Sequence, residues 1–119
     1  MLGKSYLYHL RPGYGSDKLL LQFFLDGDDV AFNNDLLATL QDINPKIDLV
    51  EDLWMNDEVV FHISSKHGTF YLSKDIWGFT FIMAENNQLA IKIIDEILSR
   101  SDLFEKEEVD FDNYRDVKS

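Results

Sequence analysis

Residues 59–74, VVFHISSKHGTFYLSK, predict a β-hairpin and decide the fold class. Apolar side chains recur at alternate positions on both sides of Lys66-His67-Gly68, as expected for two strands that bury one face. The expected inward positions are Val59, Phe61, Ile63, Phe70 and Leu72. The strands are therefore predicted at 59–65 and 69–74, with a turn between them.

Further strands are expected on either side of this hairpin, at 5–11, 18–25, 47–54 and 77–83. The first two are separated by a turn that contains Pro12, Gly13 and Gly15, and we expect them to pair as a second hairpin. The run of strands from residue 47 onward indicates an antiparallel meander.

Two helices complete the expected fold. Residues 33–35 (Asn-Asn-Asp) are each able to cap a short helix that Asn44-Pro45 ends. A C-terminal helix is capped by Asn86 or Asn87, and its apolar stripe consists of Leu89, Ala90, Ile93, Ile94, Ile97 and Leu98. The prediction is an α+β fold, with a mainly antiparallel sheet of five or six strands and two helices packed on it.

The length of 119 residues fits one domain with its own hydrophobic core. We expect a single α+β domain over residues 1–101. Residues 102–119 hold seven acids and three bases, and they are expected to form an acidic tail that is partly docked or disordered.

Charge limits the kind of partner. The chain has 22 acidic and 11 basic residues, a formal net charge of −11. Such a field repels nucleic-acid phosphates and anionic membranes and attracts basic protein surfaces. The alternative is that the acids only keep the protein dissolved.

The environment is also constrained by composition. There is no cysteine, so disulfides and cysteine-bound zinc are excluded. The longest uncharged apolar-rich run, 76–84, is much shorter than the roughly 20 residues that a membrane-spanning helix needs. We expect a soluble cytoplasmic protein.

Catalytic and metal-binding candidates are few. His62 and His67, with Glu58 close in sequence, supply the residue types of a metal site or an acid/base pair. However, His67 falls in a turn and His62 is predicted on the outer face of its strand. Asp26, Asp28 and Asp29 do not fit a calcium loop, because the fifth and twelfth positions hold Val30 and Leu37.

Known catalytic motifs are absent as well. There is no Gly-x-Ser-x-Gly motif, and no glycine-rich dinucleotide loop. We therefore expect no catalytic residues, no metal and no cofactor.

The stretch VEDLWMNDE (50–58) surrounds an apolar pair with acids. In a regular strand, Ile47, Leu49 and Leu53 form the buried set, and Trp54 shares the solvated face with neighbouring aspartates. An exposed tryptophan within carboxylates resembles the centre and rim of a protein-binding site. Alternatively, one β-bulge between Asp48 and Trp54 buries the tryptophan. The candidate partner-binding residues are Asp48, Asp52, Trp54, Asp57, Glu58, Asp26, Asp28 and Asp29.

These features resemble the bacterial immunity proteins of contact-dependent growth inhibition systems. The resemblance covers size, charge, element order and the acidic stretches DGDD (26–29), VEDLWMNDE (50–58) and LFEKEEVDFDNY (103–114), without a shared motif. It implies an inhibitor that binds a basic toxin domain, often a nuclease, and blocks its active site or substrate groove. Two alternatives stay open, namely a small accessory or structural interaction subunit and an enzyme that uses His62, His67 and nearby carboxylates.

Overall fold

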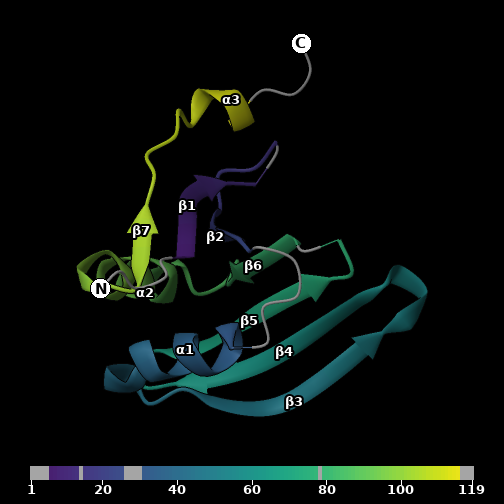
Figure 1. The fold of residues 1–119 in the computed structure, drawn as a ribbon. Coiled ribbons are helices and arrows are strands. Elements are labelled where there is room, and N and C mark those ends of the chain that lie inside the picture. The colour runs from purple at the N-terminus through teal and green to yellow at the C-terminus, as the bar shows by residue number, and fades with distance from the viewer. Residues whose placement is uncertain (1–5, 14, 26–30, 78, 116–119) are drawn as a thin grey trace.

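The computed structural model describes residues 6–13, 15–25, 31–77 and 79–115. The strands in these ranges are β1 (Tyr6–Pro12), β2 (Leu19–Phe24), β3 (Lys46–Leu53), β4 (Glu58–Ser65), β5 (Gly68–Asp75), β6 (Phe79–Met83) and β7 (Phe104–Lys106). The helices are α1 (Phe32–Thr39), α2 (Gln88–Arg100) and the short α3 (Asp112–Arg115), with 3₁₀ turns η1 (Gln41–Ile43) and η2 (Trp54–Asn56). Figure 1 shows their arrangement.

The seven strands that the described residues form make one sheet in the order β3-β4-β5-β6-β2-β1-β7. The α+β class and a mainly antiparallel sheet are confirmed. The predicted number of five or six strands was wrong, because β7 adds a seventh strand, which pairs parallel with β1. The segment expected as an acidic tail thus begins with a strand of the sheet, and Phe104 at its start is buried.

Both predicted hairpins form. In the β4–β5 hairpin Val59 pairs with Lys74 and Ser65 with Gly68, and β1 pairs antiparallel with β2. The Ser65 hydroxyl donates to the Gly68 carbonyl at 2.8 Å, which closes the turn. Gly68 has φ +97°, a conformation that glycine adopts without steric cost.

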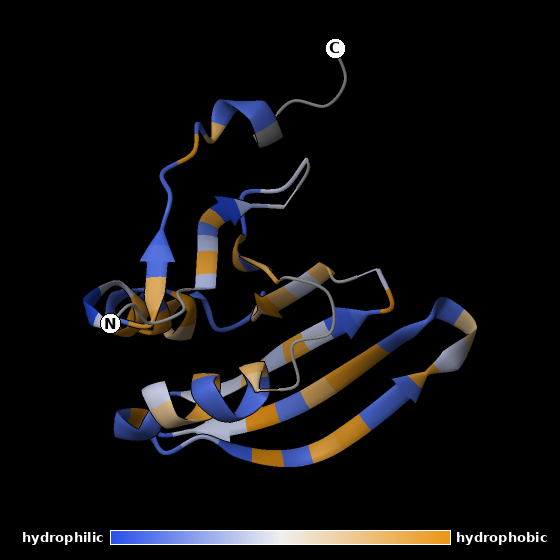
Figure 2. Cartoon of the chain, viewed as in Figure 1, coloured by the Kyte–Doolittle hydropathy of each residue, from blue (hydrophilic) through white to orange (hydrophobic). Residues whose placement is uncertain are grey.

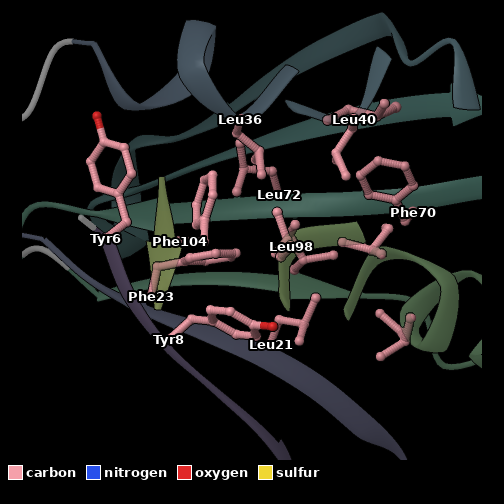
Figure 3. Packing of buried hydrophobic residues seen from close by; sticks show 14 of the residues in the cluster. Tyr6, Tyr8, Leu21, Phe23, Leu36, Leu40, Phe70, Leu72, Leu98 and Phe104 are labelled. Carbon is pink, nitrogen blue, oxygen red and sulfur yellow. The ribbon is translucent and has the colours of Figure 1, made fainter. Parts of the chain in front are cut away.

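The core lies between one face of the sheet and the two longer helices (Figure 3). Sheet residues in the core include Tyr8, Leu21, Phe23, Phe70 and Leu72. From the helices come Phe32, Leu36, Ile91, Ile94 and Leu98. The strand register places these sheet residues on the same side of the sheet. Helices α1 and α2 therefore both pack on that face, and neither helix covers the opposite face.

A partly buried polar network fixes α2 and β7 to β1. The Tyr8 hydroxyl donates to Asp95 Oδ1 at 2.9 Å, and Lys106 Nζ donates to Asp95 Oδ2 at 3.1 Å. Burial, and then the adjacent Asp95 carboxylate, raise the pKa of the Tyr8 hydroxyl well above its usual value, so the hydroxyl remains a donor.

Two details of the helices differ from expectation. Helix α1 begins one residue before Asn33, and its N-cap, Ala31, makes no side-chain capping bond, so the Asn-Asn-Asp run lies inside the first turn. Helix α2 starts after Asn87 as predicted, but Leu89 is exposed and Ile91 is buried. The buried stripe is therefore rotated from the predicted one.

Within the described part of the chain, no helix is long and apolar enough to cross a membrane.

Candidate protein-binding surface

Strand β3 is an edge strand, and this position decides the exposure of its side chains. Residues 46–52 are all exposed. A bulge between Ile47 and Leu49 changes the register, so Ile47 pairs with the buried Ile63 whereas Leu49 pairs with His62 on the opposite face. The prediction of a buried set formed by Ile47, Leu49 and Leu53 was wrong, because the first two lie on different faces and both are exposed.

Trp54 lies in the turn that joins β3 to β4. Its side chain is 73% exposed, and its neighbour Met55 is exposed as well. The predicted alternative of a bulge is present at Asp48, but it does not bury Trp54, because the strand ends at Leu53 and Trp54 enters η2. Asp57 closes this turn with φ 55°, a left-handed conformation that aspartate tolerates better than most residues.

The loop after β5 lies beside this turn. The Ile76 amide donates to the Asp57 carbonyl at 3.1 Å. Asp75 Oδ1 accepts the amides of Trp77 at 3.0 Å and Phe79 at 2.9 Å, which fixes the loop. Trp77 is 66% exposed, so two tryptophans from separate loops are presented at the same end of the sheet.

A groove of about 440 Å³ lies between these elements. Its apolar walls are formed by Trp54, Val59, Phe61 and Ile76. Its carboxylates belong to Asp52, Asp57, Glu58 and Asp75. We define the hairpin-tip surface as Trp54, Met55, Ile76 and Trp77 together with these four carboxylates. Figure 1 shows this turn at the end of the β3–β4 hairpin away from α1.

Two of the four carboxylates are engaged within the protein. Glu58 accepts the Ser73 hydroxyl, and Asp75 accepts the loop amides. Among the described residues, the carboxylates of Asp52 and Asp57 have no hydrogen-bond or ion-pair partner. The one cation among the groove's described lining residues, Lys74, donates to Asn33 Oδ1 at 3.3 Å. Two carboxylates therefore remain available to an external cation.

The predicted site residues are only partly brought together. Asp52, Trp54, Asp57 and Glu58 line one groove. Asp48 is exposed at the bulge, four residues before Asp52 and toward the opposite end of β3. The predictions on Asp26, Asp28 and Asp29 lie outside the described residues.

Sequence reasoning missed Ile76, Trp77 and Asp75 as part of this surface. Trp77 was assigned to a strand, but β6 begins at Phe79. The signal for a loop was Asp75, whose side chain caps the following amides.

The two histidines that the sequence offered as metal ligands lie on different elements. His62 Nε2 lies 2.9 Å from Glu51 Oε1, and its ring meets Tyr71 edge to face. His67 lies in the β4–β5 turn beyond the end of the strand that carries His62. In the described ranges, no group of three or more His, Cys, Asp or Glu residues is placed to hold a metal ion.

Comparison with known proteins found no matching family, no matching curated protein and no matching solved structure.

Proposed function

We propose that this protein is an acidic inhibitor that binds a basic protein domain through its hairpin-tip surface. The observation that carries the proposal is the 73% exposure of Trp54 beside the carboxylates of Asp52 and Asp57, which have no partner among the described residues. Trp77, 66% exposed, lies in the neighbouring loop. A toxin domain of the nuclease type is the partner that best fits this chemistry, because nucleases carry basic substrate grooves. This function is that of an immunity protein.

The tryptophans supply the binding free energy in this proposal. An aromatic side chain buries about 150–250 Å² when it is enclosed, and interface hot spots are enriched in tryptophan. Because Trp54 contributes little to the hydrophobic core, most of its surface is left for a partner to bury. Loss of such an anchor typically costs about 2 kcal/mol or more, roughly a thirtyfold change in Kd.

The carboxylates supply rate and selectivity. A chain of net charge −11 attracts a cationic partner at long range, and complementary charge raises association rates toward about 10⁸ M⁻¹s⁻¹ at low salt. Carboxylates at the rim of the groove then orient a lysine or arginine of the partner. The same charge disfavours nucleic acid as the direct ligand.

The proposal predicts that a basic toxin-type domain is encoded beside this gene, and the test uses that domain. Co-expression is expected to protect cells from that domain, and the purified proteins are expected to form a complex that weakens as salt rises. Trp54→Ala should weaken the complex about thirtyfold, whereas Leu89→Ala on α2 should leave it unchanged. Toxicity that persists in the presence of this protein, or a complex insensitive to Trp54→Ala, would refute the proposal.

A further inference from the structure

The two edge strands of the sheet, β7 and β3, differ in length and in how well they are protected from pairing with another strand. The β7 edge has three residues, and the chain that continues from it bonds back to the sheet through the Glu107 amide and the Tyr8 carbonyl, 3.0 Å apart. Glu105, Lys106 and Glu107 place charges along it. A short, charged edge is one of the ways in which proteins prevent pairing with other strands.

The β3 edge also carries charges, but it is longer and exposes two adjacent apolar residues between them. It has eight residues, of which 46–52 are exposed, and no strand of the described chain pairs with its outer side. Leu49 is 55% exposed, and Val50 beside it is exposed too. Figure 2 shows hydrophobic and hydrophilic segments alternating along β3. A long edge strand with apolar side chains and free backbone groups is a template for an added strand.

The side chains of β3 determine which residue types an added strand would need at each position. Val50 pairs with Phe61 on the helix-bearing face, and Asp52 shares that face two residues on. Leu49 and Glu51 share the opposite face in the same way. Each face therefore offers one apolar residue followed by one carboxylate, although Glu51 Oε1 also lies 2.9 Å from His62 Nε2. The complementary strand would have two adjacent apolar residues and two adjacent cations.

We propose that β3 binds an extended segment of the partner protein with this apolar and cationic pattern, as an additional antiparallel strand. The inference rests on the proposed function, because it describes how the basic partner binds. It also places the bound segment next to Trp54, where β3 ends. Backbone hydrogen bonds would supply affinity, and the 49–52 side chains would supply selectivity.

A second copy of this chain is a poor occupant of the same edge. Strand β3 carries three carboxylates, those of Asp48, Glu51 and Asp52, and one ammonium, that of Lys46. Each copy of β3 would bring a net charge of −2, from three carboxylates and one ammonium, and the repulsion between two such strands disfavours self-pairing. The charge therefore favours a cationic segment.

A peptide probe tests this mode of binding directly. The probe is Thr-Lys-Lys-Val-Val-Thr, and the control is the same peptide with N-methyl groups on alternate backbone nitrogens, which keeps the charge but removes backbone donors. At saturating peptide, hydrogen exchange of outward-facing β3 amides is expected to slow by about tenfold with the probe only. Equal effects of the two peptides, or protection elsewhere in the sheet, would overturn the inference.

A pair of matched variants locates the contact on the protein. Leu49→Lys should abolish the protection by placing a cation on the edge, and Leu89→Lys, at a similarly exposed position on α2 (63%), should not. If the probe protects the β3 amides equally in the two variants, the peptide does not bind at the β3 edge. If the probe fails but Trp54→Ala still weakens the basic partner's complex, only the inference falls. If the probe binds β3 but the neighbouring toxin is not neutralised, the proposed function falls instead.

Discussion

Tyr8→Phe should destabilise the protein by removing one hydroxyl from the partly buried network of Tyr8, Asp95 and Lys106. Tyr8 is fully buried, and its hydroxyl donates to the Asp95 carboxylate at 2.9 Å. A hydrogen bond to a charged acceptor contributes about 1.5–3 kcal/mol to folding, so we expect a loss of about 2 kcal/mol. With an unfolding entropy of about 2.1 cal/mol/K per residue over 119 residues, Tm should fall by about 8 °C.

The assay is urea unfolding followed by tryptophan fluorescence, with a thermal scan beside it. Tyr71→Phe is the control, because Tyr71 is exposed on the opposite face of the sheet and its hydroxyl has no hydrogen-bond partner among the described residues. The unfolding free energy of the Tyr71→Phe variant should remain within about 0.5 kcal/mol of that of the parent protein. If Tyr8→Phe is as stable as Tyr71→Phe, the network does not hold β7 and α2 to the sheet as described.

Three further predictions follow from the same structure. Folding raises the pKa of the Tyr8 hydroxyl, so the stability that this group contributes is fully present below the unfolded pKa of about 10 and is lost as the pH rises above it. Alkaline titration should therefore destabilise the parent protein more than the Tyr8→Phe variant. Equal curves of unfolding free energy against pH for the two proteins would contradict this. Gly68→Ala should cost about 1–3 kcal/mol in urea unfolding, because φ is +97° and the new Cβ would lie 2.6 Å from Asn87 Nδ2; an unchanged unfolding midpoint would be contrary evidence. Trp54→Ala should change stability by less than about 0.5 kcal/mol, since the side chain is 73% exposed; a larger loss in calorimetry would mean that Trp54 is structural.

The hairpins were predictable because alternation of apolar residues is a local signal. Apolar residues occupy alternate positions from Val59 to Ile63 and from Phe70 to Leu72, and the register places them on the same face of the β4–β5 hairpin. Strand β7 was not predictable in this way, since three residues are too few to show a period. Phe104 is buried by tertiary contacts with the rings of Tyr8, Phe23 and Phe32, which come from three different elements.

The candidate site was predictable in its residues but not in its geometry. The acidic surroundings of Trp54 were visible in the sequence, whereas the exposure of Leu49 depends on the position of β3 at the edge of the sheet and on the bulge at Asp48. Strand order is a tertiary property that no local pattern contains. The contribution of Trp77 likewise depends on two loops that meet across the sheet, joined by the bond from the Ile76 amide to the Asp57 carbonyl.

The association rate of the complex with the neighbouring basic toxin domain tests the central claim most directly. The double variant Asp52→Asn/Asp57→Asn is compared with Asp17→Asn/Asp42→Asn, which removes the same charge from exposed positions outside the groove. At low salt the first should associate about tenfold more slowly than the second, and the difference should vanish at high salt. Equal rates for the two double variants at low salt would contradict a partner that binds at the hairpin-tip surface.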